Sequence, residues 1–489
     1  MDYSQFGSMI PELIVLGIFM LVFLFDTFSC EKGKKILTPF TTILFGLGTI
    51  AIWLLPADGE LVFGGMYIND TTTNALKAIL NVGVFIVFLQ SAKWVESDEV
   101  AIRKGEFYEL ILVTLFGMYL MVSARHFLLF IIGLESASLP LAALVAFNKN
   151  HYESHEAAIK YIMTAVFSSA LLLVGLSFVY AFSGGSLYFD DLAITISQGQ
   201  TSGLLIVALA FVIAGIGFKL SLVPFHLWTA DVYQGAPTAI TSYLSVISKG
   251  AAAVAFFIIF VQCFGAVYSE AWEWMLYGII ILTITVGNLF AVRQKNMKRF
   301  MAFSSISQAG YIMLGVMAAD GLGLAGMLFY IFVYVVSNLG AFAVISTIED
   351  KTGLVGMDDY NGLHKTNPWL SFAMTLAMFS LAGIPPFAGF FSKILIFTSV
   401  TGTGSWALYM LVLIALINTI ISLYYYLLVV KAMWISADEP KIETFRSACS
   451  ARAAIWICVA GIVLFGLVSY IYEYCYDAVQ NSLSFLLLF

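Results

Sequence analysis

Long apolar stretches, separated by short polar joints, fill nearly the whole sequence of 489 residues. A helix needs about 20 mostly apolar residues to cross a bilayer, and about fourteen such stretches fit this chain. The pattern therefore predicts an all-α polytopic membrane protein. The spans are expected near residues 10–28, 37–55, 74–94, 107–123, 126–147, 157–182, 203–222, 236–264, 274–292, 300–318, 323–348, 367–397, 405–433 and 453–473.

The joints between these spans are too short to hold a soluble domain, since the longest runs only from near residue 433 to residue 452. We therefore predict a single membrane domain over residues 1–489. The chain also lacks a G-x-x-x-x-G-K-[ST] loop for nucleotide phosphates. Any uphill transport must draw its energy from a partner protein or from another ion gradient.

The composition supports this environment and argues against two kinds of ligand. The chain is 61% hydrophobic and only 11% charged, whereas soluble domains contain roughly 25% charged residues. Its net charge of −7 is spread over the joints and predicts no nucleic-acid surface. The five cysteines form no C-x-x-C pair, so neither a metal site nor a disulfide framework is predicted.

Basic residues predict the orientation of the spans. Most of the 23 Lys and Arg residues lie in odd-numbered joints, and Arg125 is the exception in an even-numbered one. Because cytoplasmic loops are rich in Lys and Arg, the odd joints are expected to be cytoplasmic and both termini to lie on the outer side.

Five charged residues remain inside apolar segments, where each costs about 2.5–3.5 kcal/mol at the centre of a helix. They are Glu135, Lys160, Lys219, Lys249 and Lys393. A structural ion pair or snorkelling explains a single such residue as well as a function does, but five in one chain favour a function. Lys160 lies early in its span and can reach the surface, whereas Glu135 is expected to be the counter-ion of Lys160 or Lys219. Lys77 lies nearer a segment end, where snorkelling suffices.

These residue types suit proton transfer. A lysine has an unperturbed pKa near 10.4, and desolvation lowers it by up to several units. At an effective dielectric of about 20, increasing the distance between a lysine and a carboxylate from 4 to 8 Å weakens their attraction by roughly 2 kcal/mol. Moving a carboxylate would therefore switch a buried lysine between holding and releasing a proton.

Two spans contain proline in their middle, at Pro224 and at Pro385 and Pro386. Paired interrupted helices in the two halves of a chain indicate inverted repeats and an ion site near the membrane midplane, although two structural kinks would give the same pattern. His226 follows the first break, and its unperturbed pKa near 6.5 suits a proton relay.

Four stretches resemble the antiporter-like membrane subunits of respiratory complex I, and among them the subunit N family. They are GLESASLPLAALVAF, EAAIKYIMTAVFSSALLLVG, FKLSLVPFHLWTADVYQGAPTAITSYLSVISKGAA and GIPPFAGFFSKILIF. The resemblance implies two inverted five-helix repeats, each with a proline-broken helix. The expected division is 1–104 for N-terminal helices, 105–265 and 274–433 for the repeats, and 434–489 for a C-terminal loop and helix.

The resemblance also implies roles for the buried charges. Glu135 and Lys219 would form a modulating pair beside Lys160, while Lys249 would be the central relay and Lys393 would face the exit. Together with His226 these residues would move protons, driven by redox chemistry elsewhere in a proton-translocating NADH-quinone oxidoreductase.

The same resemblance implies that this chain binds no cofactor and has no redox centre. NADH, FMN, iron–sulfur clusters and quinone are expected in partner subunits, and the chain is expected to act only with other membrane subunits in a lipid bilayer. A bacterial plasma membrane is the expected location, with an organelle inner membrane or a thylakoid membrane as the alternative.

Two other functions remain open at this point. One is a subunit of an Mrp-type cation/proton antiporter, although lysines stand where the oxygen ligands of sodium would be expected. The other is a scaffold that transports nothing, which predicts that every buried charge is paired and that the interior is dry.

Overall fold

The computed structural model describes residues 3–29, 31–198, 203–265, 272–435 and 440–482. Within these ranges, 13 helical segments are long and apolar enough to cross a membrane. They are α1 (Ile10–Phe28), α3 (Leu37–Leu54), α4 (Thr71–Val95), α5 (Lys104–Ser123), α6 (Phe127–Val145), α7 (Tyr152–Phe182), α9 (Gly203–Leu220), α11 with α12 (Thr238–Tyr243 and Lys249–Ile258), α13 (Trp272–Ala291), α14 (Met297–Ala318), α15 (Gly321–Thr352), α19 (Trp406–Ile435) and α20 (Cys449–Leu467).

A fourteenth crossing is made by two shorter helices, so the predicted number of spans is confirmed. The stretch 367–397 was expected as one span, but it forms α17 (Pro368–Ala382) and α18 (Ala388–Gly402) in succession. The remaining helices are α2 (Glu31–Lys34), α8 (Phe189–Gln198), α10 (Leu227–Gly235), α16 (Leu363–Thr366) and α21 (Tyr470–Gln480), and the strands are β1 (Leu61–Val62) and β2 (Tyr67–Ile68), which form a hairpin. Short 3₁₀ segments lie at Tyr3–Met9, Ala101–Arg103 and Met357–Tyr360, and short π-helical segments lie at Leu244–Ser248 and Ile259–Cys263.

The crossings form two sets of five that are inverted relative to each other. The first set is α5, α6, α7, α9 with α10, and α11 with α12, and the second is α13, α14, α15, α17 with α18, and α19. Because successive crossings alternate in direction, an odd number of crossings in the first set makes the second set enter from the opposite side. The fourth crossing is the broken one in both sets.

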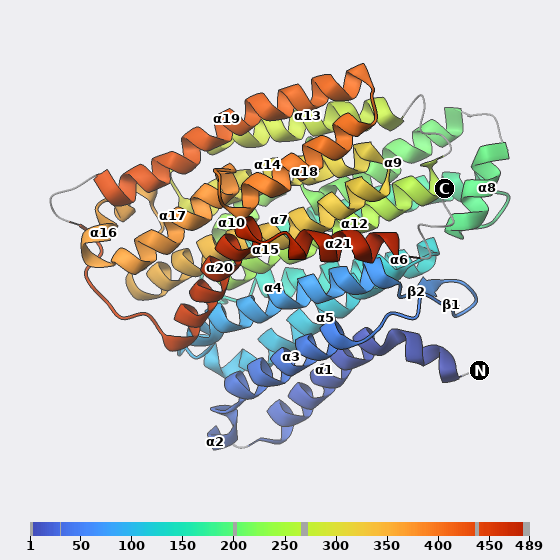
Figure 1. The fold of residues 1–489 in the computed structure, drawn as a ribbon. Helices are drawn as coiled ribbons and strands as arrows, with labels where there is room; N and C mark the ends of the chain where they lie inside the picture. The colour runs from blue at the N-terminus through green and yellow to red at the C-terminus, as the bar shows by residue number, and fades with distance from the viewer. Residues whose placement is uncertain (1–2, 30, 199–202, 266–271, 436–439, 483–489) are drawn as a thin grey trace.

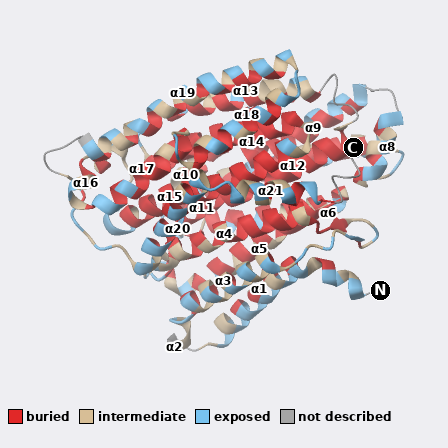
Figure 2. Cartoon of the chain, viewed as in Figure 1, coloured by how far each residue is buried: buried red, intermediate tan, exposed pale blue. Residues whose placement is uncertain are grey.

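The core of the bundle lies where the two sets meet. The membrane-spanning windows of the α11–α12 segment, α14 and α15 are 100% buried, whereas those of α1, α3, α7 and α19 are only 33% buried. Figure 2 shows the same gradient, with buried residues concentrated on the central helices and exposed residues along α19 and along α1 and α3. In Figure 1, α2 and α16 mark one end of the bundle, and α8 and the β1–β2 hairpin mark the other.

Two amphipathic helices were not predicted. α8 forms in a stretch expected to be a polar joint, and α21 follows α20, which ends at Leu467 although the last span was expected to reach residue 473. α21 packs against α15 and α4, burying Cys475 and Val479 on one face. Its sequence YIYEYCYDAVQ mixes aromatic and polar residues, so it was not recognised as a separate element.

Candidate functional site

The break between α9 and α10 leaves its backbone groups satisfied within the protein. Ser221 has a left-handed backbone, with φ of 61°, and the next N–H, of Leu222, donates to the Gly217 carbonyl at 2.9 Å. The Val223 N–H donates to the Thr283 hydroxyl of α13 at 3.0 Å. Unwound backbone at membrane depth requires such internal partners. The hydrogen bonds from Leu222 and Val223 therefore stabilise the break as part of the fold.

Lys219 lies in the last turn of α9, directly before this break, and is 4% exposed. Its Nζ donates to the Ser138 hydroxyl of α6 at 2.7 Å and lies 3.4 Å from the Ala137 carbonyl. Both partners are neutral.

Glu135, predicted to be the counter-ion of Lys160 or Lys219, does not contact either lysine directly among the described residues. Glu135 forms an ion pair with neither Lys219 nor Lys160, and its Oε1 instead accepts a hydrogen bond from the Ser169 hydroxyl of α7 at 2.5 Å. Ser138, one turn further along α6, occupies the contact with Lys219 that the carboxylate was expected to make.

Lys160 is not a buried charge. Its side chain is 42% exposed and lies 2.7 Å from both the Glu156 and Asp231 carboxylates. Asp231, on α10, also binds Arg299 at 2.7 Å, and these residues line an open cavity of about 230 Å³. Lys160 therefore lies in a solvated ionic network at one end of the bundle, because its position early in α7 places it beyond the apolar part of the helix. Asp231 was missed because it follows the break in a stretch assigned to no span.

Lys249 begins α12 immediately after the π-helical turn Leu244–Ser248, a distortion often found at functional sites. Its side chain is 2% exposed. Its Nζ donates to the Ser305 hydroxyl of α14 at 2.6 Å and lies 5.5 Å from the centre of the Tyr233 ring of α10. As with Lys219, the described neighbours include no ion-pair partner.

Lys393 lies against the second break. Its Nζ donates to the carbonyls of Leu381 and Ala382, both at 3.0 Å, at the end of α17. These carbonyls have no donor within the helix because α17 ends there. Gly383 follows with φ of +85°, and a Cβ at this position would lie 3.1 Å from the Lys393 Cδ. Glycine therefore both terminates the helix and leaves room for the lysine.

One face of α14 connects the surroundings of Lys249 and Lys393. Ser305 binds Lys249, and the Gln308 amide one turn later donates to the Leu381 carbonyl at 3.3 Å, the same carbonyl that accepts from Lys393. A further turn along, the Tyr311 ring centre lies 5.1 Å from the Lys393 Nζ. A small cavity of about 10 Å³ beside Lys393 and Gln308 is at the lower limit for one water molecule.

His226 lies in the first break, at the N-cap of α10, where the sequence placed it. Its Nδ1 is buried and has no hydrogen-bond partner among the described residues. A buried polar atom without a partner is uncommon. This nitrogen is the observation that keeps His226 a candidate for the proton relay.

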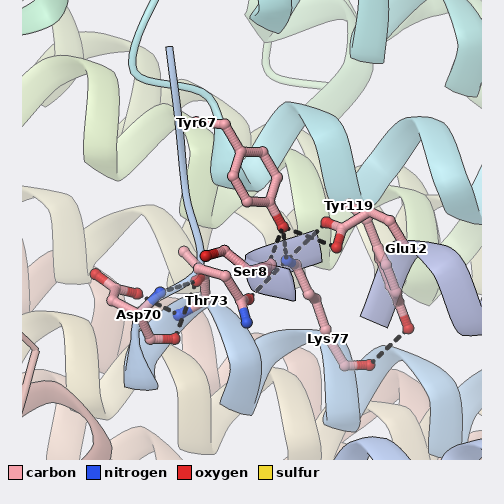
Figure 3. A network of polar contacts seen from close by, with 8 residues as sticks. Ser8, Glu12, Tyr67, Asp70, Thr73, Lys77 and Tyr119 are labelled. Carbon is pink, nitrogen blue, oxygen red and sulfur yellow. Dashed lines mark hydrogen bonds and ion pairs between the residues drawn. The ribbon is translucent and has the colours of Figure 1, made fainter. Parts of the chain in front are cut away.

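A separate ionic network lies between α1 and α4 and was not predicted (Figure 3). Lys77, assigned to snorkelling from the sequence, is fully buried and lies 2.7 Å from the Glu12 carboxylate, which is itself 1% exposed. Its Nζ also donates to the Asn69 side chain at 2.8 Å and to the Tyr67 hydroxyl at 3.2 Å. Tyr67 donates to Glu12 at 2.8 Å, since burial and the nearby carboxylate raise the pKa of the phenol. The sequence feature that could have revealed this network is Glu12, a carboxylate within the first apolar segment.

Among the described residues, no three His, Cys, Asp or Glu side chains gather as metal ligands. A membrane bundle with two inverted halves, a broken helix in each half and buried lysines beside the breaks has the architecture of antiporter-like membrane proteins.

Comparisons with known proteins identify the family within this class. The family model of the NADH:quinone oxidoreductase/Mrp antiporter transmembrane region matches residues 124–422. NADH-quinone oxidoreductase subunit N of Phocaeicola vulgatus is 51% identical over 98% of this chain and 99% of its own length. A chain of respiratory complex I from Thermus thermophilus, solved with bound aureothin, is 30% identical and superposes with a TM-score of 0.77, covering 94% of this chain and 97% of that one.

A chain of the Mrp complex from Dietzia sp. DQ12-45-1b superposes with a TM-score of 0.83 at 18% identity, over 100% of this chain and 99% of that one. At that identity the likeness shows the shared fold alone. The chain belongs to the subunit N branch of the NADH:quinone oxidoreductase/Mrp antiporter membrane family.

Proposed function

We propose that this chain translocates protons across a membrane as one subunit of a multisubunit NADH-quinone oxidoreductase. The observation that carries the proposal is the set of three buried lysines, Lys219, Lys249 and Lys393, which have only neutral hydrogen-bond partners. With neutral partners, loss of the proton from the amine leaves no unpaired buried carboxylate behind, so the uncharged form is less costly than it would be in an ion pair. Proton exchange requires both forms.

In this proposal residues 105–265 and 274–433 form the two halves of the pathway, flanked by residues 1–104 and 434–489. The end of the bundle marked by α2 and α16 faces the cytoplasm, because the basic joints gather there. Both termini then lie on the outer side. A bacterial plasma membrane fits the source of the relative from Phocaeicola vulgatus.

The proposed route begins at the open ionic network and proceeds through the core. Lys160, with Asp231, collects protons at the cytoplasmic cavity. The next step is at Lys219, where a shift of α6 would bring Glu135 in place of the Ser138 hydroxyl. Lys249 receives the proton, with His226 beside the first break.

The second half of the route passes along α14 and ends at Lys393. Gln308 and Lys393 share the Leu381 carbonyl, and the small cavity beside them provides room for a bridging water. Lys393 then releases the proton toward the outer side.

The energy for transport comes from redox chemistry in partner subunits, and this chain holds no redox centre. NADH, FMN, iron–sulfur clusters and quinone are bound by those partners, in keeping with the names of its relatives. The chain therefore works only within the assembled complex.

The test is the proton-to-electron ratio of the complex in proteoliposomes. Lys219→Ala should lower the ratio by the share that this subunit contributes, while the control Lys149→Ala, at an exposed joint, should leave it unchanged. A Lys219→Ala complex that assembles and pumps at the normal ratio refutes the proposal. Replacing both sodium and potassium with choline in the same assay separates proton transport from cation exchange, which requires one of these two ions.

A further inference from the structure

A cavity of about 430 Å³ opens where α17 and α20 begin, at the end of the bundle marked by α16. Its lining divides into two parts. One part is polar and basic, with Arg446, Arg452 and Asn367, and the other is apolar, with Trp369, Trp456 and Val459. Nothing in the proposed proton route uses it.

The basic part carries the positive charges of Arg446 and Arg452. Among the described residues, neither Arg446 nor Arg452 takes part in an ion pair or a side-chain hydrogen bond, and the cavity lining contains no carboxylate. Both arginines are exposed. Arginine is well suited to binding phosphate because its planar guanidinium donates two parallel hydrogen bonds.

The chain segment that brings these arginines to the cavity is fixed in place. The Asn367 side chain donates to the Glu443 carbonyl at 3.0 Å and accepts from the Phe445 N–H at 3.3 Å. Asn367 directly precedes α17. This clamp holds the segment before α20 against the start of α17, so that the cavity has a defined shape.

The apolar part of the lining is aromatic and partly exposed. Trp369 and Trp456 are 69% and 51% exposed, and their rings approach each other at 5.8 Å. Tryptophan at this height is typical of a membrane interface. Below the two rings the cavity continues along Phe372, Ile455 and Val459 on the two membrane-spanning helices.

We propose that this cavity binds an anionic phospholipid, with the phosphate between Arg446 and Arg452 and an acyl chain along α17 and α20. Basic pockets between transmembrane helices on the cytoplasmic side bind anionic head groups. A soluble anion would use the arginines but not the apolar wall, and an acidic peptide would leave that wall unfilled. The combination of both surfaces matches a lipid.

The test is native mass spectrometry of the delipidated complex titrated with phosphatidylglycerol or phosphatidylcholine. The double variant Arg446→Gln/Arg452→Gln should weaken the tightest phosphatidylglycerol site on the order of thirtyfold, from about 1 kcal/mol per basic residue near the surface. The control Lys295→Gln/Lys431→Gln removes the same charge from exposed positions outside the cavity and should leave that site intact.

Four results would overturn the proposal. Equal affinity for both lipids would remove the role of the arginines, and equal loss in both double variants would show a diffuse charge effect. Displacement of the lipid by millimolar inorganic phosphate would indicate a site for a free anion. Loss of a neighbouring subunit from the double variant, with lipid retained, would show that a protein covers this surface. None of these readouts depends on proton translocation.

Discussion

Buried lysines occur in two kinds of surroundings in this molecule, beside a carboxylate or beside neutral groups only. Lys77, between α1 and α4, is fully buried against the Glu12 carboxylate at 2.7 Å, with three further polar or aromatic neighbours. Lys219, Lys249 and Lys393, beside the helix breaks, are buried against hydroxyls, carbonyls and rings. Burial is nearly the same for all four, so the partner decides what each can do.

The difference separates a structural charge from a mobile one. Removing the proton from Lys77 would leave Glu12 as an unpaired charge in the interior, which is strongly unfavourable. Removing it from Lys249 would leave the neutral Ser305 and Tyr233. The first lysine therefore holds α1 against α4, whereas the second is the one that the proposed function requires to exchange protons. Four predictions test this contrast.

The largest effect is expected from breaking the paired lysine. Glu12→Gln leaves Lys77 buried without a counter-ion and should destabilise the subunit by about 3–5 kcal/mol. Thermal unfolding of the purified complex would measure this loss. The double variant Glu12→Gln/Lys77→Met removes both charges and should recover most of the stability. If the double variant is no better than the single one, Lys77 does not depend on its partner.

A smaller change in stability, of opposite sign, is expected when a buried lysine without an ion-pair partner is replaced. Lys249→Met removes a buried amine that has no counter-ion, so it should stabilise the fold by roughly 1–3 kcal/mol while abolishing translocation. The same unfolding assay applies. Destabilisation as large as that of Glu12→Gln would show that Lys249 has an ionic partner that the described contacts omit.

A smaller perturbation tests the role of the neutral hydrogen-bond partners. Ser305→Ala removes the 2.6 Å acceptor of Lys249 at a cost of about 1 kcal/mol to the charged amine. The pH profile of translocation should move toward lower pH, because the amine then loses its proton more readily. Ser371→Ala removes a buried hydroxyl that bonds only the Asn367 carbonyl, and its profile should match the unmodified complex.

The smallest effect is expected in the solvated network at Lys160. Asp231→Asn removes the carboxylate shared by Lys160 and Arg299. Since these groups are about one-third exposed or more, solvent screens them and the stability change should stay within about 1 kcal/mol. Repeating the measurement in 0.5 M salt should shrink the difference further. A larger, salt-independent loss would mean that the network is buried by another subunit.

The contrast also shows what the sequence could reveal. Hydrophobic runs placed all fourteen crossings, and the prolines marked both breaks, because spanning length and helix disruption are local properties. The hydrogen-bond or ion-pair partner of a buried charge is not a local property of the sequence. Glu12 and Lys77 are 65 positions apart in the numbering, and only the packing of α1 on the bundle brings them together. For the same reason Ser138 beside Lys219 and Ser305 beside Lys249 were not foreseen.

The most direct test compares the two groups in one assay, the proton-to-electron ratio of the reconstituted complex. The account predicts that Lys249→Met lowers the ratio, while Glu12→Gln/Lys77→Met, which removes an equally buried lysine together with its counter-ion, leaves it unchanged. A normal ratio in Lys249→Met, or an equal loss in both variants, would contradict the claim that neutral partners distinguish the proton-carrying lysines.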